Sequence, residues 1–203
     1  FGFKLNEIIE INSIKDNKLK TVYICGLGNK TKDINALDFE KIGGRITELT
    51  KLRTKISVII DKEVNDNEDI MRLGYGSILG SYSFNKYKTK KLINHKLSLM
   101  EIVSNNHTKL NKDFIRYASI SDGVFYARDL VNEPSNVLYP KAYAQRIQKL
   151  RQHGLKIEVL GESKMKTLKM HSLVGVGQGS QRESQLVIMH WNGAKAKKNQ
   201  PIC

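Results

Sequence analysis

Cysteine is almost absent from this 203-residue chain, which contains only Cys25 and Cys203. Two isolated cysteines provide neither a disulfide framework nor a CxxC metal site, so a disulfide-stabilised secreted domain is excluded. The sequence therefore favours a reducing, cytoplasmic location. Cys25 lies within an apolar run, and we expect it to be a core residue rather than an activated nucleophile.

Long hydrophobic runs are missing as well. The densest one, Ile56 to Ile60, is bounded by Lys55 and Asp61 and falls far short of the ~18 to 20 apolar residues of a membrane-spanning helix. The first residues, Phe1 to Glu7, have neither an initiating methionine nor the basic-then-apolar layout of a secretory signal. We expect a soluble protein without a membrane partner, and a start that is an internal cut point.

Acidic residues are too few to balance the basic ones. The 34 Lys and Arg exceed the 20 Asp and Glu, which gives a net charge of +14. Such an excess is typical of proteins that bind polyanions, and it leaves a basic nucleic-acid-binding module, with DNA as partner, as an alternative function. The basic residues are mostly lysines spread along the chain among many Asn and Ile, which biased codon usage alone would also produce.

The apolar residues, 40% of the chain, are sufficient for a globular core, and their pattern predicts an α/β fold. Residues 1–112 are predicted to form an N-terminal mixed-sheet α/β domain. Gly43 and Gly44 lie within its first helix, where each costs about 1 kcal/mol relative to Ala, so we expect them to allow close packing against a neighbouring backbone. Strands are predicted over residues 21–25, 55–60 and 97–103, and helices over residues 39–49 and 69–81.

The stretch from Ala127 to Pro140 indicates a hinge between two domains. Residues 105–111 are polar and predict a turn, after which residues 113–134 are predicted to form a linker helix. Pro134 ends this helix because it lacks a backbone donor and restricts the residue before it. Pro140 suits the first turn of the next helix.

Residues 135–203 are predicted to begin a second α/β domain. About 70 residues are fewer than the ~100 to 150 of a usual domain, so this domain is expected to be incomplete. Its first helix is expected to stop at Gly154. Further strands are predicted over residues 156–160, 172–176 and 185–191, and a short helix over residues 162–168.

The spacing of polar residues predicts no catalytic constellation. No serine occupies a Gly-x-Ser-x-Gly elbow. Arg128, Asp129 and Glu133 are conceivable as an acid/base set, but charged residues on an interdomain helix more often form salt bridges and caps, so no catalytic role is assigned to them. The histidines have no pair at the i, i+4 spacing that presents two imidazoles to one zinc ion, and we expect them at the surface or at interfaces. They are His95, His107, His153, His171 and His190.

Two glycine-rich segments invite a nucleotide-binding interpretation. Gly175 to Ser180 follows a predicted strand, but it lacks the third glycine of a dinucleotide fingerprint and leads into another strand rather than a helix. A structural turn is therefore favoured. Gly26-Leu27-Gly28 lacks both the third glycine and the Lys-Ser/Thr pair of a P-loop.

Several separated segments, in matching order, are similar to leucyl aminopeptidases, also called cytosol aminopeptidases. The strongest is Asp122 to Pro134, together with Asn136 and Pro140, which resembles the family's linker helix and the start of its catalytic domain. Glu183 and Ser184 stand where the family usually has proline, so we expect that turn to differ. The other similar segments are Gly26 to Gly28, Gly43-Gly44, Leu79 to Lys88, Gly177 to Ser180 and His190 to Gly193.

The resemblance implies a metalloprotease that releases N-terminal amino acids, leucine among the preferred ones, from peptide substrates. It also implies two divalent ions, manganese or zinc, and a homohexamer with the catalytic domains at its core; some family members bind DNA. The family's ligands lie in Gly-Lys-Gly, Asp-x-Gly-Gly and Asn-Thr-Asp-Ala-Glu-Gly-Arg-Leu motifs, none of which occurs here. We therefore expect no catalytic, cofactor-binding or metal-binding residue in this chain, no bound metal and no peptidase activity from it alone.

Overall fold

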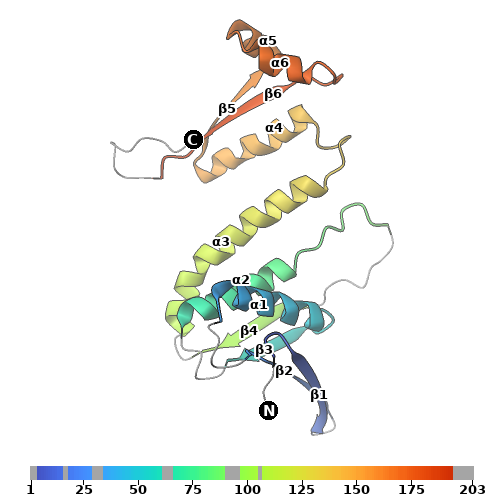
Figure 1. Ribbon diagram of the computed structural model, residues 1–203, viewed down its shortest axis with the longest axis vertical. Helices are drawn as coiled ribbons and strands as arrows, with labels where there is room; N and C mark the ends of the chain where they lie inside the picture. Colours follow the sequence, from blue (N-terminus) through green and yellow to red (C-terminus); the bar gives the residue numbers. More distant parts are fainter. Residues whose placement is uncertain are drawn as a thin grey trace. The chain divides into compact units, whose positions relative to one another are not determined.

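The computed structural model describes residues 4–15, 18–28, 34–60, 66–89, 97–104 and 107–193. The chain divides into two compact units, Phe1–Asp129 and Leu130–Cys203. Strands and helices alternate along both units, which confirms the predicted α/β class (Figure 1). None of the described helices is both long enough and apolar enough to span a bilayer. The boundaries expected at residues 112 and 134 stay predictions.

Two short sheets form in the first unit. β1 (Ile8–Lys15) and β2 (Lys18–Cys25) are an antiparallel hairpin in which Ile8 lies opposite Cys25. β3 (Lys55–Ile59) and β4 (Leu99–Val103) pair in parallel, with Lys55 opposite Leu99. The three strands predicted for this domain are confirmed with small shifts of their ends, whereas β1 has no counterpart among them.

Two capped helices, α1 (Ala36–Thr50) and α2 (Asn67–Gly80), lie side by side (Figure 1). They confirm the helices predicted over residues 39–49 and 69–81. The Asn35 side chain accepts a hydrogen bond from the Asp38 amide, and the Asp38 carboxylate accepts one from the Asn35 amide. Asp66 caps α2 in the simpler way, by accepting from the amide of Glu68. These side chains satisfy backbone donors that the first turn of a helix leaves free.

Glycines bring the backbones of α1 and α2 together. A Cβ atom added to Gly43 would overlap the carbonyl oxygen of Leu73, and one added to Gly76 would overlap the backbone of Glu40. A Cβ atom on Gly44 would lie 3.6 Å from the Gly76 carbonyl oxygen, which is an ordinary contact. The predicted close packing is therefore confirmed at Gly43, whereas a Cβ atom at Gly44 would be tolerated.

The third helix, α3 (His107–Asn132), starts earlier than expected. The turn predicted over residues 105–111 is wrong for residues 107–111, which form its first turn. Leu110 gives the reason, because its side chain is 8% exposed and packs into an apolar cluster with Ile70, Met71 and Tyr117. The helix ends just before Glu133 and Pro134, as the proline predicts.

A charged network joins α1, α2 and α3. Arg72 on α2 donates to the carboxylates of Glu40 on α1, at 2.7 Å, and of Glu68, at 3.0 Å. The hydroxyl of Tyr117 on α3 also donates to Glu68, and the Arg72 guanidinium lies 5.4 Å from the centroid of the Tyr117 ring. The hydrogen bond from Tyr117, followed by that from Arg72, lowers the pKa of Glu68. Its carboxylate thus stays ionised over a wider pH range than usual.

The second unit contains a strand pair and short helices among its described residues. Pro140 lies in the first helical turn and Gly154, with φ of 90°, ends the 3₁₀ helix, both as predicted. The strands pair antiparallel, with Lys156 opposite His190. The elements are α4 (Pro140–Gln148), η1 (Lys149–His153), β5 (Lys156–Gly161), α5 (Glu162–Thr167), α6 (His171–Gly177) and β6 (Gln185–His190).

The strand predicted over residues 172–176 is wrong, because these residues belong to α6. Val174 is 3% exposed and packs with Leu160 and Met165, whereas Leu173 and Val176 are exposed. A helix lets Val174 enter the core while its apolar neighbours point elsewhere. A short apolar run does not distinguish a strand from a buried helix by its pattern alone.

Replacing Gly76 with Ala should destabilise the first unit. The added methyl group has to displace the backbone of α1 at Glu40, and such overpacking typically costs about 1 to 3 kcal/mol, more than the ~1 kcal/mol that Ala contributes through helix propensity. The control is Gly123→Ala on α3, where nothing lies within 4 Å of the new Cβ atom and stability should rise. Urea denaturation followed by circular dichroism compares the two variants with the wild type. If Gly76→Ala unfolded at the same urea concentration as Gly123→Ala, the close contact between Gly76 and Glu40 would be contradicted.

Replacing Tyr117 with Phe should make stability less sensitive to acid. Because the folded-state pKa of Glu68 is lowered, its carboxylate stabilises the fold above the unfolded-state pKa of ~4.3, and this contribution is lost as pH falls through the folded-state pKa. Tyr117→Phe removes the largest cause of that lowering. The gap in free energy of unfolding between wild type and variant should therefore narrow from about pH 7 to about pH 3.

Tyr75→Phe is the control for this measurement. The Tyr75 ring lies 5.3 Å from that of Tyr117, but its hydroxyl has no hydrogen bond to any described residue. Urea denaturation at several pH values should show a constant offset for Tyr75→Phe. A constant offset for Tyr117→Phe as well would show that the hydrogen bond does not control the titration of Glu68.

Candidate functional site

The described residues contain no group of three or more His, Cys, Asp or Glu side chains that could hold a metal ion. His107, His153, His171 and His190 are exposed and lie on four different elements, so their expected surface positions are confirmed. His95 lies outside the described residues.

Arg128 and Asp129 attach the end of α3 to the segment that follows α2. Arg128 donates to the carbonyl oxygen of Leu79 at 3.0 Å, and its guanidinium lies 5.3 Å from the centroid of the Tyr82 ring. The Tyr82 hydroxyl donates to the Asp129 carboxylate at 2.8 Å. These contacts position the end of the helix.

Glu133 and its partner Arg146 both belong to the second unit. Its carboxylate forms an ion pair with Arg146 of α4 at 3.0 Å, and its side chain is only 3% exposed. Burial of a carboxylate is unfavourable unless a cation and hydrogen bonds compensate for the lost water, which Arg146 does here. The three charged residues of the conceivable acid/base set thus make separate contacts.

The turn predicted over Gly175 to Ser180 is confirmed for residues 178–180 and wrong for Gly175 to Gly177, which lie in α6. A Cβ atom added to Gly177 would overlap the hydroxyl of Ser184. The Ser184 amide donates to the Glu162 carboxylate at 2.9 Å. The glycine therefore allows a close contact within the second unit.

The turn after β2 is likewise bound to its own chain. The Gly26 amide donates to the Glu7 carbonyl at 2.8 Å, and the Asn6 amide donates to the Gly26 carbonyl at 3.0 Å. Gly28 has φ of 84°, a left-handed conformation that glycine adopts without strain. Gly26 thus continues the pairing of β1 and β2 at the open end of the hairpin.

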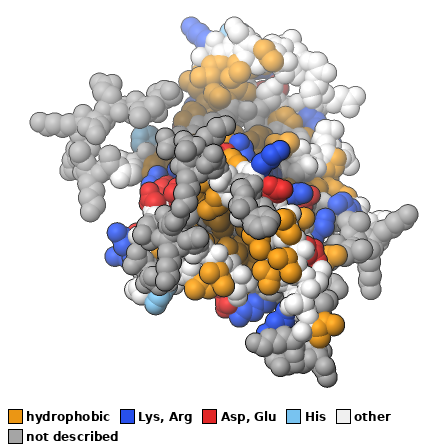
Figure 2. Space-filling model, turned by 60° about the horizontal axis from the view of Figure 1, so that its bottom comes forward, with side chains coloured by type: hydrophobic (Ala, Val, Ile, Leu, Met, Phe, Trp, Pro, Cys, Tyr) orange, Lys and Arg blue, Asp and Glu red, His pale blue; other side chains and the backbone are white. Residues whose placement is uncertain are grey.

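A groove between β2 and β3 in the first unit has a volume of about 730 Å³. Consecutive residues of both strands line it, Thr21 to Cys25 on one side and Lys55 to Ile60 on the other. Figure 2, which turns these strands toward the viewer, shows hydrophobic side chains gathered around a hollow. The floor is formed by helix side chains, namely Phe39, Ile42, Ile46, Leu49 and Leu73.

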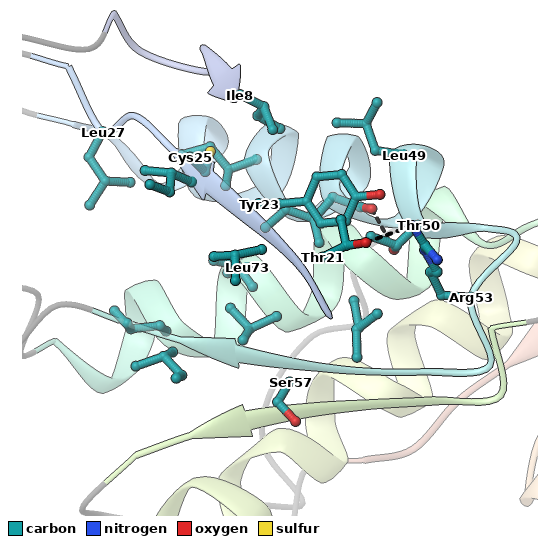
Figure 3. A pocket seen from close by; sticks show the side chains of 18 of the residues that line it. Ile8, Thr21, Tyr23, Cys25, Leu27, Leu49, Thr50, Arg53, Ser57 and Leu73 are labelled. Carbon is teal, nitrogen blue, oxygen red and sulfur yellow. Dashed lines mark hydrogen bonds between the residues drawn. The ribbon is translucent and has the colours of Figure 1, made fainter. Parts of the chain in front are cut away.

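The two ends of this groove differ in chemistry (Figure 3). Arg53 lies at one end, where it donates to the Thr21 hydroxyl at 3.1 Å and where Tyr23 raises its pKa. Cys25 and Leu27 lie at the other end. Cys25 is half-buried instead of fully buried, and burial raises the pKa of its thiol, which keeps it protonated and unreactive.

No signal in the sequence points to this groove. The two strand segments that line it, Thr21 to Cys25 and Lys55 to Ile60, are 30 or more positions apart in the chain, and each apolar run is indistinguishable from an ordinary buried strand.

Two family models match the chain. The N-terminal domain of the cytosol aminopeptidase family matches residues 1–91, and the catalytic domain of the same family matches residues 125–203. The two matches lie on either side of the middle of α3.

Curated relatives give the same result. A probable cytosol aminopeptidase of Caulobacter vibrioides is 43% identical over 139 residues, which are 68% of this chain and 28% of the relative. The proteins of the same name from Rickettsia felis and Brucella anthropi are 38% and 39% identical, with 95% and 96% of this chain and 40% of each relative covered. This chain therefore spans 28 to 40% of the length of these relatives.

Solved structures share the fold. The bottromycin maturation enzyme BotP in complex with Mn superposes with a TM-score of 0.77 at 20% identity, over 93% of this chain and 40% of that one. A mutant of tomato leucine aminopeptidase superposes with a TM-score of 0.71 at 18% identity, over 84% of this chain and 35% of that one. Because family models for two domains match and relatives align along almost the whole sequence, the chain belongs to the cytosol aminopeptidase family.

Proposed function

We propose that this chain is the N-terminal portion of a leucyl aminopeptidase, an enzyme that releases N-terminal amino acids from peptides. The observation that carries this proposal is the match of both family domains in one chain. The proposal includes the family's cytoplasmic location and its homohexamer. The domain division that goes with it assigns residues 1–112 to the N-terminal domain, 113–134 to the linker helix and 135–203 to the beginning of the catalytic domain.

The proposed enzyme uses two divalent ions, manganese or zinc. BotP, which shares the fold, was solved in complex with Mn. The described residues do not fit such a centre, because no three metal-binding side chains converge there, and the family's ligand motifs do not occur in the sequence. We therefore assign the metal ligands to positions outside these residues and derive no catalytic step within them.

What this chain contributes is structural support. Arg128 and Asp129 attach the long helix to the first unit, and the Glu133–Arg146 ion pair fixes the start of the region that matches the catalytic domain. Substrate binding and activation are proposed to depend on groups that this sequence lacks.

The purified chain should not hydrolyse leucine p-nitroanilide. With excess Mn²⁺ the rate should equal that of buffer, because the family's ligand motifs, which would hold the ions that polarise the scissile carbonyl and activate water, do not occur in the sequence. A full-length leucine aminopeptidase under the same conditions is the positive control. Turnover above the buffer rate that coelutes with the chain on gel filtration would refute the proposed inactivity.

Nucleic-acid binding is the second candidate function, and the net charge of +14 favours it. If the basic residues contact phosphates, the affinity for duplex DNA should fall steeply with salt, with a slope of log K against log salt of about −0.9 per phosphate neutralised. Fluorescence anisotropy with a labelled duplex from low to physiological salt measures this slope. Absence of binding at low salt would eliminate this candidate and leave the aminopeptidase proposal intact.

A further inference from the structure

Asn192 and Gly193 form the only Asn-Gly pair in the sequence. They follow β6 after Trp191, outside any helix or strand, and both are exposed. Among the described residues no hydrogen bond holds the Asn192 side chain or the Gly193 amide. A side-chain amide and the backbone nitrogen that follows it are therefore both accessible in the folded chain.

The packing of Trp191 favours glycine at position 193. A Cβ atom added to Gly193 would overlap the Trp191 indole, and one added to Gly154 would lie 3.2 Å from the same ring. The indole thus lies beside two glycines, one at the end of η1 and one after β6. Because Gly193 has no side chain, nothing on it hinders attack by its own nitrogen, and its backbone can adopt conformations that other residues disfavour.

The charge of the surrounding sequence favours ionisation of the Gly193 amide. Residues 184–203 contain no Asp or Glu, whereas Lys195, Lys197 and Lys198 closely follow the pair. Positive charges this close along the chain stabilise an anionic nitrogen and the oxyanion that forms when it attacks a carbonyl carbon.

We propose that Asn192 is a deamidation site, at which the folded chain is converted to a mixture of aspartate and isoaspartate. Hydroxide removes the proton of the Gly193 amide, and the nitrogen bonds to Cγ of Asn192. The bond from Cγ to the side-chain nitrogen breaks, and ammonia leaves. Water then opens the cyclic imide. Cleavage between the ring nitrogen and Cγ gives aspartate, and cleavage between the ring nitrogen and the main-chain carbonyl carbon gives isoaspartate.

The modification changes the segment that follows β6. Both products place a carboxylate at position 192, and isoaspartate also adds a methylene group to the backbone, which displaces Gly193 from the Trp191 indole. Because the same indole lies beside Gly154, the contact between the end of η1 and this segment is expected to loosen. The inference rests on these contacts and is independent of the proposed peptidase function.

The test is incubation of the whole chain in mildly alkaline buffer, followed by trypsin digestion and mass spectrometry. The tryptic peptide of residues 183–195 has Asn192 as its only asparagine, and its mass should rise by the difference between an amide and an acid. The rate should rise several-fold for each unit of pH, because more of the amide is then ionised. A sample digested without incubation gives the starting value.

A synthetic peptide of residues 183–195 gives the rate without a fold. Conversion in the whole chain should be within about tenfold of this rate, because the pair is exposed and its amides have no partners among the described residues. Slower conversion than that would show that the fold protects Asn192, and it would overturn the proposal.

Two other sites in the same digest are internal controls. Asn85 is exposed and lies outside any helix or strand, but the side chain of Lys86 hinders the attacking nitrogen. Asp122 precedes Gly123 within α3, where helical hydrogen bonds hold the backbone. An isoaspartyl methyltransferase with labelled S-adenosylmethionine detects isoaspartate in each peptide. Labelling at either control site equal to that at Asn192 would refute a site-specific reaction.

Asn192→Gln tests the effect on Trp191. Glutamine keeps the amide, but it would have to form a larger ring, which closes far more slowly. Trp191 is the only tryptophan in the chain, so its fluorescence reports on this segment. During incubation the wild-type emission should shift to longer wavelength in step with isoaspartate, while that of the variant stays constant. An equal shift in both proteins would refute the proposed link between Asn192 and the indole.

Discussion

The contact between the backbones of α1 and α2 is the constraint on which the first unit depends. Because Gly43 and Gly76 have no side chains, the carbonyl groups of Leu73 and Glu40 can approach the opposite helix directly. The buried hydroxyl of Thr47 then reaches the Ser77 carbonyl at 3.1 Å. At this short separation Phe39, Ile42 and Leu73 converge in one cluster, against which the strands pack. The floor of the groove is the outer surface of this cluster.

The sequence was informative wherever one strong local signal acts on its own. A pair of glycines within an apolar helical pattern predicts a close backbone approach, and Gly43 provides one. Pro134 and Pro140 predict the end of one helix and the start of the next because a proline ring restricts the backbone whatever surrounds it. These predictions required no knowledge of tertiary contacts.

The secondary-structure predictions were wrong where tertiary contacts determine whether a segment is a helix or a strand. Val174 lies in a run that suits either a strand or a helix, and burial against Met165 selects the helix. Leu110 is the only apolar residue in a polar segment, and its burial against α2 extends α3 to His107. β1 was missed because polar residues interrupt its isoleucines and because its pairing with β2 is what defines it.

The candidate sites show the same division. Family-specific motifs can be checked letter by letter, so the sequence sufficed to recognise the family and to find its ligand motifs missing from this chain. The groove could not be found in this way, because it is lined by residues of separate strands and helices that only the fold brings together. Fold similarity does not replace either kind of evidence, since one fold supports many functions.

Electrostatics in the two units illustrate how burial changes the role of an ion pair. Arg72 is 34% exposed and bridges Glu40 and Glu68, so water screens the charges of this network. The network therefore contributes little to stability through charge and serves mainly to orient the three helices. Glu133 is nearly inaccessible, so its bond to Arg146 must be kept or the buried charge becomes strongly unfavourable. The amides of Val137 and Leu138 also donate to the Pro134 carbonyl, both at 2.9 Å. The segment after the proline is therefore held within the second unit by specific polar contacts, which gives the end of α3 and the start of α4 a defined geometry.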